Sequence, residues 1–397
     1  MHAAPADEPA YGWVIVWATF ASLALIFGVA YSFAAFFESF SREFSAQRAD
    51  VSLVFGLTGG VYFSAGAVGG MLSDRFGPRI VCSLGMACIA LGLLATSFAN
   101  SMTGVYWSYG VGIGLGIALV YTPSIGNVQP WFTRRRGLAS GIASSGIGLG
   151  TVVVPLLATA LITRLQWREA LQALSVFVLL AGQTATSLLK RASIAAAAPG
   201  GAAATPPGST LKEALHDPRF WWFYLFTFVA APTMFIPFAH VSASARDMGV
   251  SDASAVGLVG LIGVGSLVGR FAIGTLADRL GRLRTLLLAE VSMAATYLLW
   301  MVAPGYASLA LFALWFGLSY GGIVSLMPAI CMDLFGARAI SGIVGTLYSG
   351  AALGNLLGPV LAGAVFDRFA SYQPVMWASL AFSAVAVWAC ARLLRAA

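Results

Sequence analysis

One arginine is the residue in this sequence that most directly indicates chemistry. Arg270 is the only charged residue in the Gly-rich apolar run 253–277, which is long enough to cross a bilayer. The next charge, Asp278, is eight residues further on, about 12 Å along a helix, so the guanidinium cannot easily reach the membrane surface. Inserting an arginine at such a depth costs about 2.5–3.5 kcal/mol. An anion outside this helix must compensate the charge, either a transported substrate or an acid in a permanent ion pair.

Polar side chains in other apolar runs are candidates for further contacts with such a substrate. A tyrosine offers a hydroxyl on an apolar ring, and serine and asparagine offer short polar groups. Each can equally be a packing residue, and Asn355 can instead bond a neighbouring helix. The candidate contacts are Tyr31, Tyr121, Tyr320, Tyr348, Ser349, Asn355 and Ser266, which lies four residues before Arg270.

The composition is that of an integral membrane protein. Of the 397 residues, 59% are hydrophobic and only 9% are charged, whereas soluble proteins carry about 25% charged residues. An all-α membrane fold with twelve transmembrane helices is therefore expected, since a span needs about 20 apolar residues. The predicted spans are roughly 13–37, 51–72, 79–99, 103–127, 137–163, 169–189, 220–244, 254–277, 284–303, 305–331, 339–365 and 374–394.

The segment between the sixth and seventh spans divides the chain. It is rich in Ala, Pro and Gly and cannot form a core, so it reads as a linker. We predict an N-terminal six-helix half over 1–190, a cytoplasmic linker over 191–218 and a C-terminal half over 219–397. With the N-terminus inside, the inner loops hold 15 of the 22 Lys and Arg residues and the outer loops hold six. This bias predicts an inner (plasma) membrane protein with both termini in the cytoplasm.

The two predicted halves repeat each other. GMLSDRFGPR at 70–79 and GTLADRLGRLR at 274–284 both follow the second span of a half, 204 residues apart. A weaker echo pairs SGIA at 140–143 with SGIV at 341–344. Two parallel six-helix repeats are typical of one transporter architecture. The paired loops resemble the signature of the major facilitator superfamily, and the resemblance covers nearly the whole chain.

That resemblance implies two pseudo-symmetric halves that alternate access, with charged loops that help to gate the movement. The implied gating residues are Asp74, Arg75, Asp278, Arg279, Arg134, Arg135 and Arg136. These charges can also act simply as topology signals in the loops.

Two further stretches resemble the monocarboxylate transporter family. They are YGWVIVWATF at 11–20 and WFTRRRGLASGIASSG at 131–146. That family and the related bacterial oxalate/formate antiporters carry an arginine in helix eight that holds the substrate carboxylate, and Arg270 matches it. A guanidinium presents a planar fork that fits a carboxylate and stays charged.

Departures from the family pattern matter as much. Where animal members carry a lysine in helix one and an aspartate before the helix-eight arginine, this chain has Tyr31 and Ser266. Where the oxalate antiporters carry a second cation in helix eleven, this chain has Ala351. One buried cation suits a monocarboxylate better than a dianion. Proton coupling would need other groups, and the candidates are Glu38 and His240, both expected in water near the outer surface, and Glu290, which could instead pair with an arginine such as Arg284.

The sequence thus predicts a secondary active transporter of small monocarboxylates of the lactate, pyruvate and formate class. It would be proton-linked, embedded in the lipid bilayer and active as a monomer. An organic-anion exchanger, a hydrophobic-compound efflux carrier with a structural Arg270, and a membrane sensor remain alternatives. We expect no enzyme activity, cofactor or metal, since the three histidines are scattered and the four cysteines lack metal spacing. The net charge of +7 lies mostly in loops between spans and does not indicate nucleic-acid binding.

Overall fold

The protein is a bundle of long helices, as the apolar runs require. The computed structural model describes residues 10–128, 131–132, 136–191, 208–336, 338 and 340–396. Backbone polar groups find no water in hydrocarbon, so a spanning segment must satisfy them within its own helix. Twelve segments of the described chain are long and apolar enough to cross a membrane, which confirms the predicted number of spans.

The helices fall into two groups with a short helix between them. The first group contains α1 (Ala10–Glu43), α2 (Arg48–Phe76), α3 (Pro78–Ser97), α4 (Met102–Val105), the π-helical η1 (Tyr106–Ile113), α5 (Gly114–Val128), α6 (Arg136–Arg164) and α7 (Trp167–Ser187). The short helix is α8 (Leu211–His216). The second group contains α9 (Pro218–Asp247), α10 (Asp252–Leu280), α11 (Arg282–Met301), α12 (Tyr306–Phe335), α13 (Ile340–Phe369) and α14 (Gln373–Ala396). The α4, η1 and α5 segments together form the fourth span.

The predicted repeat is visible in the backbone of the two motif loops. Gly77 separates α2 from α3 with φ 90°, and Gly281 separates α10 from α11 with φ 86°. Glycine adopts such positive angles without the steric cost that other residues incur. Each glycine amide donates to a carbonyl four residues back, that of Ser73 at 2.8 Å and that of Ala277 at 2.9 Å. The same turn thus recurs at the same place in both helix groups.

Glycines also explain how closely the central helices pack. A Cβ atom on Gly150 of α6 would lie 2.0 Å from the Ala24 carbonyl oxygen of α1. In the second group, a Cβ on Gly358 of α13 would lie 2.8 Å from Pro232 Cα of α9. Small residues allow such backbone approach in membrane bundles. Glycines of the fifth and eleventh spans therefore form tight helix pairs with α1 and α9.

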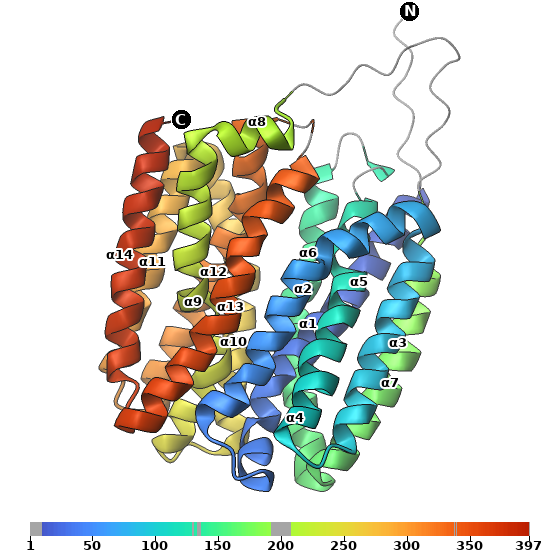
Figure 1. The fold of residues 1–397 in the computed structure, drawn as a ribbon, viewed down its shortest axis with the longest axis vertical. Helices are drawn as coiled ribbons and strands as arrows, with labels where there is room; N and C mark the ends of the chain where they lie inside the picture. The colour runs from blue at the N-terminus through green and yellow to red at the C-terminus, as the bar shows by residue number, and fades with distance from the viewer. Residues whose placement is uncertain are drawn as a thin grey trace, which may run out of the picture.

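The two groups lie side by side, with α1–α7 in blue to green and α9–α14 in yellow-green to red (Figure 1). They meet where α2 packs on α13 and α6 packs on α10, with Gly56 facing Leu356 and Gly148 facing Gly263. The short helix α8 and the end of α14 lie at one end of the bundle, which we call the α8 end. Part of the predicted linker, 192–207, lies outside the described residues, and α8 falls within the rest of it. The proposed domain limits remain a prediction.

Candidate functional site

A cavity of about 40 Å³ lies between the two helix groups. That volume suits about three water molecules, since each needs roughly 10–15 Å³. Its lining comes from α1, α2, α5 and α6 of the first group and α9, α10, α12 and α13 of the second, whereas α3, α7, α11 and α14 contribute no described residue. The lining residues are Phe27, Tyr62, Phe63, Tyr121, Ile147, Thr227, Met234, Phe235, Arg270, Tyr320, Val324, Met327, Tyr348 and Ala351. Residues from both groups thus close around one central space.

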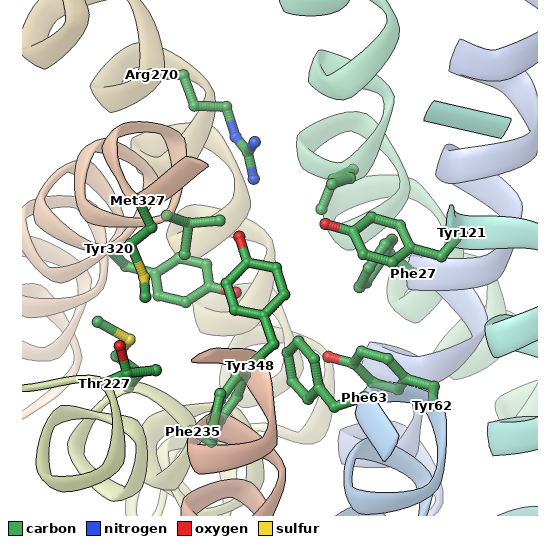
Figure 2. A pocket seen from close by; sticks show the side chains of 14 residues that line it. Phe27, Tyr62, Phe63, Tyr121, Thr227, Phe235, Arg270, Tyr320, Met327 and Tyr348 are labelled. Carbon is green, nitrogen blue, oxygen red and sulfur yellow. The ribbon is translucent and has the colours of Figure 1, made fainter. Parts of the chain in front are cut away.

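Arg270 is the only charged residue among those that line the cavity. It lies on α10, ten residues before that helix ends at Leu280, which places it about 15 Å from the helix end. Within the described chain no acid forms an ion pair with it, and its buried Nε has no hydrogen-bond partner. Figure 2 shows the guanidinium pointing into the cavity. The permanent internal ion pair that the sequence left open is therefore not formed by any described residue.

Tyrosine hydroxyls supply most of the remaining polarity. Tyr121, Tyr320 and Tyr348 line the cavity, and each interacts electrostatically with Arg270. Tyr31 does not line the cavity itself, but its hydroxyl lies 3.3 Å from that of Tyr320, which does. In Figure 2 the Tyr348 hydroxyl lies beside the guanidinium, and Tyr121 reaches in from the opposite side. Three of the four predicted tyrosines thus line the space that Arg270 faces, and the fourth supports it.

The other predicted contacts lie outside the cavity lining. Ser349 donates to the Thr346 carbonyl at 2.7 Å within α13. Asn355 is buried in the contact between α13 and α2, where it donates to the Gly56 carbonyl at 3.4 Å. Ser266 is buried on α10, with its hydroxyl unpartnered among the described residues. The structure therefore places Asn355 where the sequence allowed a helix–helix role.

Several lining residues were missed from sequence. Tyr62, Phe63 and Phe27 form a connected aromatic wall, with the Tyr62 and Phe63 ring centroids 4.3 Å apart. Phe235 faces Phe63 at 5.8 Å from across the group boundary. These residues stand in runs that are apolar on all sides, so no pattern distinguished a cavity-facing ring from a lipid-facing one. The position where related antiporters carry a second cation does line the cavity, as Ala351.

The predicted gating residues stand at the α8 end. Arg75, Asp278 and Arg279 are exposed, and none of the three forms an ion pair with a described residue. Arg134 and Arg135 lie outside the described residues, as do the side chains of Asp74 and Arg136. Their gating role remains a prediction.

The two predicted acid candidates for proton coupling have different surroundings. Glu38 pairs with Arg42 on the same helix at 2.7 Å and is partly exposed, as expected. Glu290 is 0% exposed, and both of its carboxyl oxygens lack a described hydrogen-bond partner. The alternative pairing with Arg284 is therefore not formed, because Glu290 points into the contact with α14, near Ser383.

At the end opposite α8, a cluster of polar residues joins the two helix groups. Arg48, which begins α2, donates to Asp247 at 2.5 Å and to Tyr372 at 2.7 Å. The Asp367 carboxylate accepts the backbone amides of Arg48 and Ala49 at 3.0 and 2.9 Å. A carboxylate in that position satisfies amides that the first turn of a helix leaves free. We call this cluster, together with His240 and Ser52, the interhalf lock.

His240 lies at the centre of the interhalf lock. The imidazole Nε2 is 2.8 Å from the Pro359 carbonyl and 3.1 Å from Ser52 Oγ, and Nδ1 is 3.0 Å from the Tyr372 hydroxyl. Its exposed fraction is 0%. The expectation that water solvates His240 is therefore wrong, because the second helix group covers it with α2 of the first.

The halves are fastened at two levels along their length. Hydrogen bonds and ion pairs join the two helix groups at mid-depth, between Tyr31 and Tyr320 and between Asn355 and Gly56, and at the lock end, where Arg246 also donates to the Ala34 carbonyl. The described contacts thus fasten the groups firmly at the lock end.

Comparisons with known proteins agree with this architecture. Residues 18–349 match the family model described as Major Facilitator Superfamily. The chain is 31% identical over 367 residues to monocarboxylate transporter 13 of Bos taurus, covering 91% of this chain and 84% of that protein. It is 30% identical over 382 residues to monocarboxylate transporter 3 of Rattus norvegicus, covering 92% and 76%.

Among solved structures, the fold resembles that of a bacterial homolog of the human lysosomal transporter Spinster in an inward-facing, unoccupied conformation. The TM-score is 0.75 at 16% identity, and the match covers 98% of both chains. At that identity the likeness concerns the fold alone. The family match over most of the chain and the relatives at 30% identity or more decide the assignment: this chain belongs to the major facilitator superfamily and, within it, to the monocarboxylate transporter family.

Proposed function

We propose that this protein is a secondary active transporter of small monocarboxylates of the lactate, pyruvate and formate class, with Arg270 holding the carboxylate. The observation that carries the proposal is a guanidinium in a central cavity, with no described acid to neutralise it. A carboxylate delivered from water would supply the missing charge, and the planar fork matches its two oxygens. The names of the family relatives support the same substrate class.

The tyrosine hydroxyls complete the proposed site. Tyr121, Tyr320 and Tyr348 can each donate to a carboxylate oxygen or to a hydroxyl or carbonyl on the substrate. Such neutral contacts contribute about 0.5–1.5 kcal/mol each, so the substrate is held firmly enough to select and weakly enough to leave. A single cation in the lining, with Ala351 where a second would stand, favours a monoanion over a dianion.

Access to this site would alternate by rocking of the two helix groups. The Lys and Arg bias supports an orientation with the α8 end and both termini on the cytoplasmic side of the plasma (inner) membrane. The interhalf lock would then close the outside, so the conformation described here faces inward. Transport would be carried out by a monomer, since both helix groups that line the cavity belong to one chain. It would also be proton-linked.

The test is uptake by the purified protein in proteoliposomes, with and without an imposed pH gradient. Labelled lactate, pyruvate and formate should accumulate with an inward proton gradient. Unlabelled monocarboxylates should compete, whereas oxalate and uncharged amides of the same shape should not. Accumulation of oxalate in exchange for formate would favour an anion exchanger instead. Competition by hydrophobic compounds without a carboxylate would indicate efflux with a structural Arg270.

A further inference from the structure

The hydrogen bonds around His240 fix the protonation state that the closed interhalf lock accepts. The Pro359 carbonyl can only accept, and the Ser52 hydroxyl already donates to the Arg48 carbonyl at 2.6 Å. Nε2 must therefore carry a hydrogen, which it directs at these two oxygens. In a neutral imidazole Nδ1 is then an acceptor, and the Tyr372 hydroxyl donates to it. The lock thus contains a continuous series of hydrogen bonds, in which Arg48 donates to Tyr372, Tyr372 donates to His240, and His240 donates to the Pro359 carbonyl.

Tyr372 cannot give up its hydrogen to change this pattern. Its ring is buried between Phe366 and the imidazole, with a centroid 4.6 Å from that of Phe366. Burial raises the pKa of Tyr372, so its hydroxyl stays protonated. A proton added at Nδ1 would face that hydroxyl donor-to-donor. Tyr372 would have to rotate its hydrogen elsewhere while still accepting from Arg48.

Burial opposes a positive imidazole in the closed lock, and of the neighbouring charges Arg48 opposes it too, whereas Asp367 favours it. Arg48 reaches it from α2, Asp367 from α13 and Tyr372 from the segment before α14, while Asp247 on α9 itself pairs with Arg48. The helix α1 presents only the ring of Phe37. Both carboxylate oxygens of Asp367 accept hydrogen bonds from α2 amides, and Asp247 accepts one from the Arg48 guanidinium. Both carboxylates are thus engaged by other donors, and neither makes a hydrogen bond or an ion pair with the imidazole among the described residues.

We propose that His240 is a proton-binding site whose occupancy is tied to the interhalf lock, such that the lock closes only over the neutral imidazole. When the helix groups part at this end, water reaches His240 and Nδ1 takes a proton from it, forming one N–H bond. When the lock closes, that bond breaks and the proton returns to the water on the same side. Acid on the lock side therefore holds the carrier open toward that side. This inference rests on the proposed alternating access and does not depend on which carboxylate is carried.

The effect has a definite size. An exposed imidazole titrates near pH 6.5, and closing releases at most one proton. Linkage then requires the ratio of closed to open lock to fall up to about tenfold for each pH unit below about 6.5, and to level off above it. A lock governed by carboxylates alone would change near pH 4 instead.

The test measures the distance between the two helix groups at the lock end as a function of pH. Spin labels at exposed N100C and Q373C, on the full chain with its four native cysteines replaced, report this distance in lipid nanodiscs. A long distance should appear as the pH falls from 8 to 5.5. His240→Gln, whose amide can both donate and accept, should keep the short distance throughout. His216→Gln is the matched control, because His216 bonds only its own helix at the Lys212 carbonyl, and it should titrate like the parent.

In the distance measurement, two results would overturn the proposal: a parent distance that does not change with pH, or an unchanged titration in His240→Gln. If His240→Gln does not fold, nitrogen NMR of labelled histidine replaces it. The chain has three histidines, so His2→Gln and His216→Gln identify the remaining signal. A neutral Nε2–H form at pH 8 that becomes charged together with the long distance supports the site. A charged imidazole in the closed lock refutes it. Loss of lactate uptake with an intact pH-dependent distance would instead count against the proposed substrate.

Discussion

The replacement Arg270→Gln separates a substrate-binding arginine from a structural one, because the two roles predict opposite effects on stability. As a ligand for a carboxylate, the guanidinium makes two charge-assisted hydrogen bonds. Each contributes about 1.5–3 kcal/mol, and the lower value applies here because Arg270 is only half-buried. Losing about 3 kcal/mol should reduce kcat/KM for lactate uptake by about 150-fold.

The same change should not harm the folded protein. Arg270 has no ion-pair partner among the described residues, and its Nε is buried without a hydrogen bond. An arginine at this depth costs up to about 2.5–3.5 kcal/mol, which the neutral amide relieves. The melting temperature of Arg270→Gln in detergent should therefore equal or exceed that of the parent.

Both quantities should be measured on the same preparation, with initial uptake of labelled lactate into proteoliposomes under an inward proton gradient. Arg270→Lys keeps the charge but loses the planar fork, so its uptake should fall between the two. Arg164→Gln, an exposed arginine in the last turn of α6, is the matched control and should behave as the parent. Uptake by Arg270→Gln within threefold of the parent, or a lower melting temperature, would refute the reasoning.

Three further outcomes are expected. Tyr348→Phe removes one hydroxyl beside the guanidinium and should raise the KM for lactate about two- to tenfold with an unchanged melting temperature; an unchanged KM would remove this hydroxyl from the site. Gly150→Ala should lower the melting temperature in detergent, because its Cβ would meet the Ala24 carbonyl at 2.0 Å, whereas Gly126→Ala, with nothing within 4 Å, should not. Asp217→Ala should destabilise the protein by about 1 kcal/mol at pH 7 by removing the cap of α9. Hydrogen bonds from its neighbour Arg219 lower the pKa of Asp217, so this contribution is complete above about pH 4 and is lost as the pH falls through the folded value, which a melting series over pH 2–7 would show.

Hydropathy predicted well which segments of this chain span the membrane. It predicted poorly which side chains of a span face the cavity and which face lipid. The twelve spans follow from run length, and the paired turns at Gly77 and Gly281 follow from a repeated motif. Arg270 was found because a charge in an apolar run stands out whichever way it points. Tyr62 and Phe63 did not stand out, because their helix is apolar on both its lipid-facing and cavity-facing sides.

The environment of His240 could not be predicted from sequence for a different reason. Its position late in the seventh span suggests contact with water, and only the approach of α2, α13 and Tyr372 from distant parts of the chain removes that water. Asp367 is a similar case, since an acid in the last turn of a span reveals nothing about the helix that it caps in the other half. Tertiary contacts between halves decide both roles.

The cap that Asp367 provides has a consequence for the solvent. If the halves part as proposed, the amides at the start of α2 that bond to this carboxylate in the closed lock must find water, as must the carboxylate itself. Opening would therefore hydrate polar groups of the interhalf lock that bond to each other in the closed form. Sugars and similar osmolytes, which are excluded from protein surfaces, oppose any step that creates hydrated surface. The resting balance between the two orientations of this carrier should accordingly respond to the osmotic strength of the medium, through hydration at a site far from the transported anion.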